Sequence, residues 1–208
     1  IPFEEARKLS PDECLAELDA LVGLSQVKDA MKALINSVNR ATHLAKLTGE
    51  KATVMPGHFM FLGNPGTGKT TVARMMGKIL HSMGVIQRPD VIEVDKSKMV
   101  GRYVGDTEAI TTEVINSAMG GILFIDEAYS LAGDQFGRNA LDTLLKQLED
   151  KRDRFVCIVA GYTKEMQAFV DANSGIRSRF PERHWITFED YNDDELLQIF
   201  ANLRKKEQ

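Results

Sequence analysis

The stretch GNPGTGKT at residues 63–70 decides the fold. It has the spacing of a phosphate-binding loop, in which glycines let backbone N–H groups turn inward around a phosphate. An apolar run at 58–62 precedes it, and a helical pattern begins near Thr71. The dipole at the start of that helix adds to the anion site. The stretch therefore predicts a strand, loop and helix that bind nucleotide, with Lys69 on the β- and γ-phosphates and Thr70 on magnesium.

A second stretch, GILFIDE at residues 121–127, ends an apolar run with two carboxylates. Beside a phosphate loop, Asp126 is expected to hold the magnesium shell. The longer Glu127 can reach a water behind the γ-phosphate and take its proton. Taken alone, such a pair is more often a helix cap. Its combination with the phosphate loop favours the catalytic interpretation.

Short apolar runs alternate with helical stretches along the chain. Strands that helices cover on both faces lose their alternation and become continuously apolar. The pattern therefore predicts an α/β fold with a parallel sheet between helices. The expected strands are 58–62, 91–94, 122–125, 155–160 and 185–188.

Amphipathic helices are expected at both ends of this pattern. Ser10 and Pro11 have the residue types of a helix cap and first turn. Residues 25–47 carry an apolar stripe of helical spacing, and Gly49 can end that helix. The acidic cluster 190–195 opens a helix whose apolar face cannot be buried alone, which indicates the start of a second subdomain.

Composition excludes several classes of protein. The 208 residues are 43% hydrophobic and 27% charged, which is typical of a folded globular chain. A net charge of −4 provides no basic excess for nonspecific nucleic-acid binding. This net charge does not exclude a pore that is basic locally. Two cysteines are too few for a disulfide scaffold, so a reducing cytoplasm is expected. The chain has neither a long apolar span nor a signal peptide, and it starts at Ile1, so we expect a fragment of a longer protein.

Three further stretches accompany the two motifs: VGRYVGDT at 100–107, AMGGILFIDEAY at 118–129 and VCIVAGY at 156–162. With them the chain resembles the AAA+ ATPases, a class of P-loop NTPase, from about residue 21 to 188. Within that family it is similar to the branch that holds the red-type rubisco activase CbbX, the stage V sporulation protein K and the type VII secretion ATPases. The resemblance implies a five-stranded sheet in the order 5-1-4-3-2, a helical lid and a ring, usually of six subunits.

The same resemblance implies a domain division. Residues 1–20 would be a lead-in segment and 21–189 the large α/β nucleotide-binding subdomain. Residues 190–208 would begin a helical lid that is truncated here.

The resemblance also assigns the family's first pore loop to Arg102, Tyr103 and Val104. An amphipathic aromatic ring there can grip varied polypeptides, and the flanking Gly101 and Gly105 would let the loop move. A plain exposed tyrosine is the simpler interpretation.

An arginine that reaches a neighbour's nucleotide is implied for the stretch GIRSRFPER at 175–183. Such an arginine stabilises charge on the transferring phosphoryl group. Arg179 is the first choice and Arg177 the second, while Arg183 could anchor the next strand. Surface ion pairs are the simpler interpretation.

One departure from the broader family lies at AGYT, residues 160–163. Many relatives place there an asparagine that orients the attacking water. Thr163 or Tyr162 could supply a hydroxyl instead, and the sequence leaves both open. Val22 and Gly23 match the family's adenine-contacting segment. The expected nucleotide contacts are Val22, Gly23, Asn64, Pro65, Gly66, Thr67, Gly68, Lys69, Thr70 and Thr71.

We therefore expect an ATP- and Mg²⁺-dependent motor that forms a homo-oligomer, a hexamer by resemblance, and pulls a protein client through its pore. The alternative is a nucleotide-gated assembly module with slow turnover. A GTPase is disfavoured because the guanine signature Asn-Lys-x-Asp is missing, and a small-molecule kinase would not need the acidic pair. The scattered histidines His43, His58, His81 and His184 are expected to be structural or solvated, and Cys157 a buried inert thiol.

Overall fold

The computed structural model describes residues 10–49, 55–103 and 105–206. Its elements alternate between helices and short strands, as the apolar runs predict. In chain order they are α1 (Pro11–Asp19), α2 (Ser25–Thr48), β1 (Phe59–Leu62), α3 (Lys69–Ser82), β2 (Val91–Val94), α4 (Lys96–Met99), α5 (Asp106–Ser117), β3 (Ile122–Ile125), η1 (Ala128–Ala132), α6 (Gln135–Asp150), β4 (Val156–Gly161), α7 (Thr163–Ala172), α8 (Ser174–Arg179), η2 (Glu182–His184), β5 (Trp185–Thr187) and α9 (Asp193–Lys206).

The five strands form one parallel sheet in the order β2-β3-β4-β1-β5. This is the expected order 5-1-4-3-2 read from the other edge, so the predicted fold class is confirmed. The strand boundaries agree with the prediction to within one residue. The start of α3 was predicted two residues too late, because Gly68, at φ +91°, turns the chain directly into a helix at Lys69.

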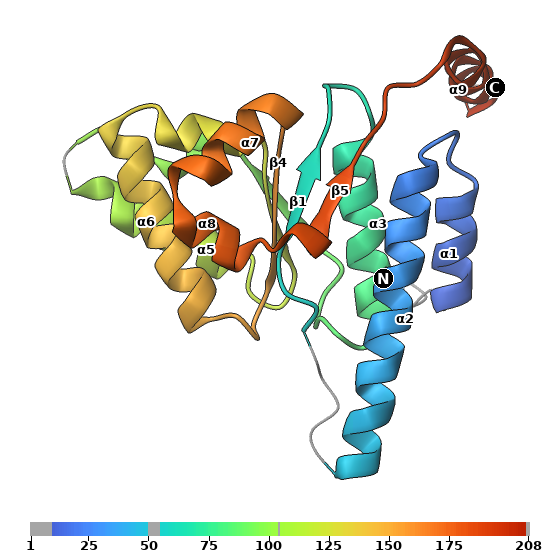
Figure 1. The fold of residues 1–208 in the computed structure, drawn as a ribbon, viewed down its shortest axis with the longest axis horizontal. Coiled ribbons are helices and arrows are strands. Elements are labelled where there is room, and N and C mark those ends of the chain that lie inside the picture. The colour runs from blue at the N-terminus through green and yellow to red at the C-terminus, as the bar shows by residue number, and fades with distance from the viewer. Residues whose placement is uncertain (1–9, 50–54, 104, 207–208) are drawn as a thin grey trace, which may run out of the picture.

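Helices cover both faces of the sheet (Figure 1). Alternate residues of the strands pack into two separate cores. In β4, Ile158 joins the core beneath α1, α2 and α3, whereas Val159 joins the core beneath α5, α6, α7 and α8. Every residue of β4 is buried, because this strand lies at the centre of the sheet. This two-sided burial explains the continuous apolar runs in the sequence.

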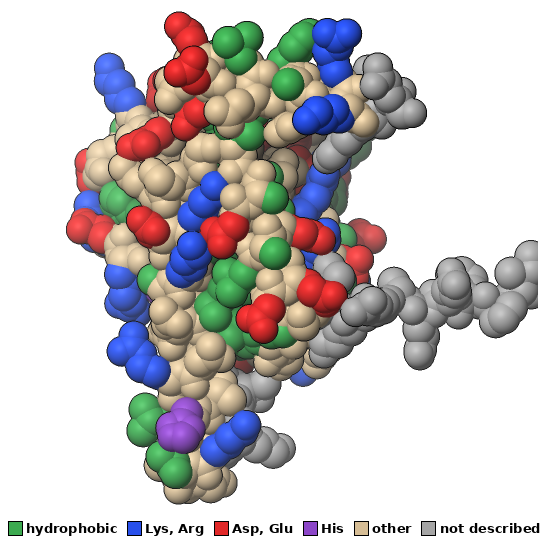
Figure 2. Space-filling view, turned by 90° about the vertical axis from the view of Figure 1, so that its right-hand side faces the viewer, with side chains coloured by type: hydrophobic (Ala, Val, Ile, Leu, Met, Phe, Trp, Pro, Cys, Tyr) green, Lys and Arg blue, Asp and Glu red, His purple; other side chains and the backbone are tan. Residues whose placement is uncertain are grey.

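The predicted start of α1 and the predicted end of α2 are confirmed. The Ser10 hydroxyl accepts a hydrogen bond from the Glu13 N–H, and the Glu13 carboxylate accepts one from the Ser10 N–H. Gly49, at φ +72°, ends α2. The outer end of α2 extends beyond the sheet and exposes Leu44 and Leu47, and Figure 2 shows hydrophobic side chains gathered there.

Two of the histidines that were predicted to be structural or solvated, the buried His58 and the half-buried His184, have structural contacts. His58 Nδ1 accepts a hydrogen bond of 3.0 Å from the Cys157 N–H. The His58 carbonyl oxygen lies 2.9 Å from His184 Nδ1, and the His184 ring stacks on Phe59. Burial lowers the pKa of His58 to about 4 and raises that of the Cys157 thiol. Both groups are therefore uncharged parts of the core at neutral pH.

After β5 the chain runs to α9, which lies beyond the ends of α1 and α2 (Figure 1). Four large apolar side chains on α9 are exposed: Leu196, Leu197, Phe200 and Leu203. Within the described residues, we find no helix whose length and hydrophobicity would let it traverse a bilayer.

Candidate functional site

The phosphate-type loop between β1 and α3 has a shape that two of its glycines make possible. A Cβ atom on Gly63 would lie 2.6 Å from the Phe188 carbonyl oxygen, so this position has no room for a side chain. Gly68 adopts φ +91°, a conformation that other residues rarely take. A hydrogen bond within the loop stabilises this shape: the Thr67 hydroxyl donates to the Asn64 carbonyl oxygen at 2.7 Å.

Lys69 folds back over this loop. Its ammonium donates to the carbonyl oxygens of Gly63 at 2.8 Å and Asn64 at 2.6 Å. Burial lowers the pKa of Lys69, and the negative charges of Asp126 and Glu127 oppose that shift. The side chain is therefore a partly desolvated cation, and its reduced contact with water strengthens its attraction for an anion.

The two carboxylates follow the end of β3. The Asp126 N–H continues the sheet by donating to the Val94 carbonyl oxygen at 2.9 Å, and Asp126 Oδ1 accepts from the Glu127 N–H at 3.0 Å. Glu127 has φ +48° and ψ +45°, and among the described residues only Leu24 is another non-glycine residue with positive φ. Such a conformation costs about 1–3 kcal/mol and is concentrated at functional sites. In the described structure the Glu127 side chain makes no capping hydrogen bond to η1, so the simpler cap interpretation is not what is observed.

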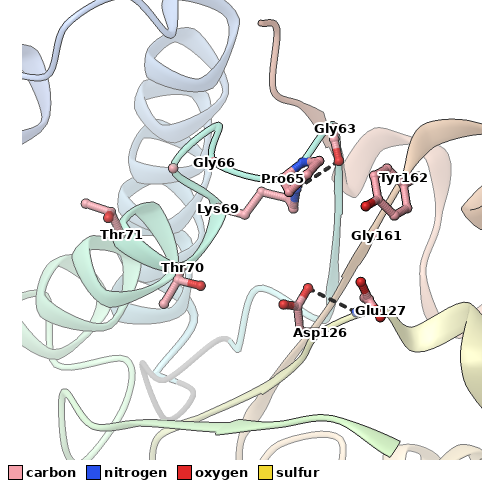
Figure 3. A pocket seen from close by; sticks show the side chains of 11 residues that line it. Gly63, Pro65, Gly66, Lys69, Thr70, Thr71, Asp126, Glu127, Gly161 and Tyr162 are labelled. Carbon is pink, nitrogen blue, oxygen red and sulfur yellow. Dashed lines mark hydrogen bonds between the residues drawn. The ribbon is translucent and has the colours of Figure 1, made fainter. Parts of the chain in front are cut away.

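These groups meet in one cleft of about 380 Å³ at the carboxyl edge of the sheet. Figure 3 shows the side chains of Lys69, Thr70, Asp126, Glu127 and Tyr162 around one space, whereas Thr71 points away from the carboxylates. The lining residues are Gly63, Pro65, Gly66, Gly68, Lys69, Thr70, Thr71, Asp126, Glu127, Gly161 and Tyr162.

The donor set of the cleft fits a magnesium ion. A hydroxyl from Thr70 and a carboxylate from Asp126 are hard oxygen ligands, which this cation prefers. Across the ranges that the structure describes, no group of three or more His, Cys, Asp and Glu side chains is placed to hold a metal by itself. Magnesium in phosphate sites is typically held by one or two side chains together with phosphate oxygens and waters. The cleft therefore suits a polyphosphate with its cation.

A carboxylate that the motifs did not indicate lies beside Thr70. The Thr70 hydroxyl donates to Glu93 Oε1 at 3.2 Å, and Glu93 Oε2 lies 3.3 Å from Nη2 of Arg74. The only signal in the sequence is that Glu93 interrupts an otherwise apolar strand, VIEV at 91–94.

Of the two hydroxyl candidates after β4, Tyr162 lines the cleft and Thr163 does not. Thr163 is the exposed first residue of α7. The Tyr162 ring lies 6.1 Å from that of Tyr129, and a Cβ atom on Gly161 would come within 2.8 Å of Tyr129 Cδ1. The two tyrosines therefore pack tightly around the end of β4.

Four of the expected nucleotide contacts lie outside the cleft lining: Val22, Gly23, Asn64 and Thr67. Gly23, Asn64 and Thr67 lie close to α9 and to the segment that precedes it. A Cβ atom on Gly23 would meet Glu195 Oε1 at 2.6 Å, and the Asn64 amide donates to both carboxylate oxygens of Asp190 at 3.0 and 2.9 Å. The Tyr191 hydroxyl also donates to the Thr67 carbonyl oxygen at 3.3 Å.

The arginine segment, residues 177–183, is apart from the cleft lining. Arg177 forms ion pairs with Glu182 at 2.6 Å and Asp171 at 3.0 Å. Arg179 Nη2 lies 3.6 Å from Glu149, its side chain is only 27% exposed, and its Nε atom is buried with no partner among the described residues. Arg183 borders an apolar groove between α2 and β5.

The expected pore segment is partly described. Tyr103 is 74% exposed and Arg102 is exposed, whereas Val104 lies outside the described residues. At Gly101 a Cβ atom would lie 2.4 Å from the Asp106 Cβ, which is a steric reason for glycine besides the expected freedom of the loop. The Gly101 N–H also donates to the Thr107 hydroxyl at 3.0 Å. Close packing therefore accounts for glycine at this position.

Comparisons with known proteins agree with this geometry. The family model described as "ATPase family associated with various cellular activities (AAA)" matches residues 59–188. Stage V sporulation protein K of Bacillus subtilis is 44% identical over 190 residues, which are 88% of this chain and 57% of that protein. The ESX-3 secretion system protein EccA3 of Mycolicibacterium smegmatis is 42% identical over 198 residues, 93% of this chain and 32% of that protein. Protein CbbX of Cereibacter sphaeroides is 42% identical over 198 residues, 92% of this chain and 62% of that protein.

The chain thus spans 32% to 62% of the length of these relatives. Among solved structures, the crystal structure of the FIGL-1 AAA domain in complex with ADP has a TM-score of 0.59 to this chain at 20% identity. The match covers 92% of this chain and 66% of that one. At this identity the likeness concerns the fold.

Proposed function

Because this chain belongs to the AAA family of ATPases, we propose that it binds ATP with Mg²⁺ in the cleft at the carboxyl edge of its sheet and hydrolyses it. The observation that carries the proposal is the convergence of Lys69, Thr70, Asp126 and Glu127 on one cleft. A desolvated ammonium, an N-terminal helix turn and two carboxylates are the groups that phosphoryl transfer to water requires.

Each residue has a distinct task in this proposal. The loop N–H groups and Lys69 bind the β- and γ-phosphates, and Thr70 and Asp126 hold the cation. Magnesium, when bound, neutralises charge on the phosphate oxygens. Glu127 accepts a proton from the attacking water, and the strained backbone at this residue keeps its carboxylate in the cleft. The Tyr162 hydroxyl is the better candidate for orienting that water, since Thr163 lies outside the lining.

We propose that Arg179, or Arg177 in second place, acts on the nucleotide of a neighbouring subunit. Neither side chain lines the cleft of its own chain. AAA proteins are typically oligomeric, which supports a site shared between subunits, here in a ring of six. The Arg179 side chain is 27% exposed, and its guanidinium is held by Glu149 at 3.6 Å and by the Ser178 hydroxyl at 2.7 Å. Because the Nε atom is buried, a phosphate of a neighbouring subunit would be met by the Nη atoms.

In the same ring Tyr103 would contact a protein client in the central pore. The support is its 74% exposure, together with relatives that include secretion-system proteins. Residues 21–189 would be the large subdomain, and residues 190–208, which include α9, would be the start of a helical lid. The rest of that lid would cover the exposed apolar face of α9. Two free, buried cysteines suit a reducing cytoplasm.

The test is a Glu127→Gln variant, which keeps the size of the side chain and removes its basicity. ATP turnover should fall about a hundredfold or more, whereas ATP affinity should stay within about threefold of the parent chain. Equilibrium binding of a fluorescent ATP analogue and steady-state phosphate release measure the two quantities. Glu113→Gln, an exposed glutamate on α5, serves as the matched control and should change neither.

The two outcomes separate a motor from the nucleotide-gated module. Turnover that survives in Glu127→Gln would contradict the hydrolytic mechanism. Binding of ATP by the parent chain without any turnover, at all protein concentrations, would favour the module.

A further inference from the structure

Glu93 is the one carboxylate on β2 that faces the phosphate loop. β2 is an edge strand that pairs only with β3, and Glu93 is in register with Phe124. Phe124 belongs to the core beneath α3, so Glu93 lies on the α3 face of the sheet. From there it reaches two residues of α3, namely Thr70 and Arg74.

The contact with Thr70 uses the proton of the threonine hydroxyl and leaves the lone pairs of its oxygen free for a cation. A threonine hydroxyl has one proton to donate and two lone pairs to offer. A hydroxyl that binds a cation does so through a lone pair, and its proton must then point to an acceptor elsewhere. In this chain the acceptor is Glu93 Oε1, at 3.2 Å from Thr70 Oγ1.

The second oxygen of the Glu93 carboxylate is occupied. Oε2 lies 3.3 Å from Nη2 of Arg74, which is one helical turn after Thr70. Arg74 therefore orients the carboxylate so that one oxygen faces the hydroxyl and the other faces the guanidinium. This arrangement suits an outer-shell residue, which aligns a ligand without binding the metal itself.

We propose that Glu93 is a positioning residue for the magnesium site: it accepts the Thr70 hydroxyl proton and so directs the Thr70 lone pair toward the cation. This inference rests on the proposed function. It adds a residue from β2 to a site otherwise built from the loop after β1 and the end of β3. The negative charge of Glu93 also favours a cation bound at the neighbouring hydroxyl.

The experiment measures how much Mg²⁺ improves nucleotide binding. The full chain is titrated with a fluorescent ATP analogue, once with Mg²⁺ and once with EDTA. In Glu93→Ala the Mg²⁺-dependent gain in affinity should fall about tenfold, as is typical when an outer-shell partner is removed. Affinity in EDTA should be unchanged. Titration with Mn²⁺, followed by electron paramagnetic resonance in the presence of ADP, should show the same weakening of the metal without any turnover.

Three further variants distinguish positioning from a general effect on the fold. Glu93→Gln keeps a carbonyl oxygen that can accept the proton but removes the charge, so it should retain part of the gain. Thr70→Val removes the hydroxyl, and adding Glu93→Ala to it should cause a much smaller loss than Glu93→Ala causes in the parent chain, because only the effect of the charge is left. Glu17→Ala is the matched control, because Glu17 also has a 42% exposed side chain that pairs with a basic residue of α3, Lys78.

Each outcome has one meaning. If the parent chain binds the analogue equally with Mg²⁺ and EDTA, or does not bind it, the proposed function fails and the role of Glu93 fails with it. If the parent chain responds to Mg²⁺ and Glu93→Ala responds equally, only the role of Glu93 is overturned. An equal loss of affinity in Mg²⁺ and in EDTA would also overturn it, since Glu93 would then act on the loop rather than on the metal.

Discussion

The cleft and the arginine segment both carry charges suited to phosphate chemistry, yet they are built in opposite ways. In the cleft, groups from three separate stretches, 63–71, 126–127 and 161–162, converge on one space. In the arginine segment, Arg177 and Arg179 are paired with carboxylates of their own surroundings, Asp171, Glu182 and Glu149.

The difference shows which part of the chemistry one chain can complete. The carboxyl ends of parallel strands meet at one edge of the sheet, so the fold itself gathers the cleft residues. The arginine segment precedes β5, at the amino end of that edge strand, and its side chains do not line the cleft. If an arginine of this segment takes part in hydrolysis, as we propose, it would have to come from a second copy of the chain.

The largest effect is expected from mixing two inactive variants. Arg179→Ala and Glu127→Gln should each lower ATP turnover about 10³-fold. When they are mixed and allowed to reassemble, sites with an intact Glu127 can meet an intact Arg179 from a neighbour, and about a quarter of the parent activity should return. Steady-state phosphate release against mixing ratio is the measurement.

If ATP turnover does not recover on mixing, the proposal that Arg179 acts on a neighbour's nucleotide is wrong. Arg179 would then act within its own chain or not at all. Homogeneous samples of each variant, carried through the same reassembly, are the control.

A second, smaller effect is the loss of stability at acidic pH, which should be larger near the arginine segment than near the cleft. The His58 ring lies 6.0 Å from that of Phe180, behind the arginine segment, whereas the residues that line the cleft include no histidine. Burial lowers the pKa of His58 to about 4, and that of His184 is lowered for the same reason. The unfolded chain therefore binds more protons than the folded chain between about pH 6.5 and pH 4.

The stability that His58 contributes is accordingly complete above about pH 6.5 and is lost as the pH falls toward 4, by about 3 kcal/mol. Urea unfolding at a series of pH values measures this loss, and hydrogen exchange should show the arginine segment opening before the cleft. His58→Gln should flatten the pH dependence, and His43→Gln, at an exposed position, should leave it intact. An unchanged slope in His58→Gln would assign the acid sensitivity to other groups.

The smallest effect is expected at Arg177. Its ion pairs with Asp171 and Glu182 are about half exposed, so Arg177→Ala should lower the free energy of unfolding by no more than about 1 kcal/mol. Turnover should stay within about twofold of the parent chain if Arg179 is the acting residue. The Arg177 guanidinium lies 6.0 Å from the Trp185 ring, so the fluorescence of this single tryptophan should report the change. If Arg177→Ala lowers turnover as much as Arg179→Ala does, Arg179 cannot be assigned as the one acting residue of this segment.

Local patterns predicted much of this protein. The sequence alone identified the five strands to within one residue, the capped helix at Ser10 and the apolar stripe of α2. It also placed the loop 63–70 and the pair Asp126 and Glu127 at strand ends, which the cleft brings together. These features are determined by residues close together in the chain, where periodicity, glycine geometry and capping act directly.

Features that depend on distances between remote segments were decided by the tertiary structure. Only the sheet order brings Glu93 of β2 within 3.2 Å of Thr70 on α3, and only the turn into α7 leaves Tyr162 in the cleft and Thr163 outside it. The same holds for Gly101, where the close approach of Asp106 leaves no room for a side chain. A linear motif specifies which residues can do the chemistry, whereas side-chain direction and close approach arise when strands and helices pack against one another.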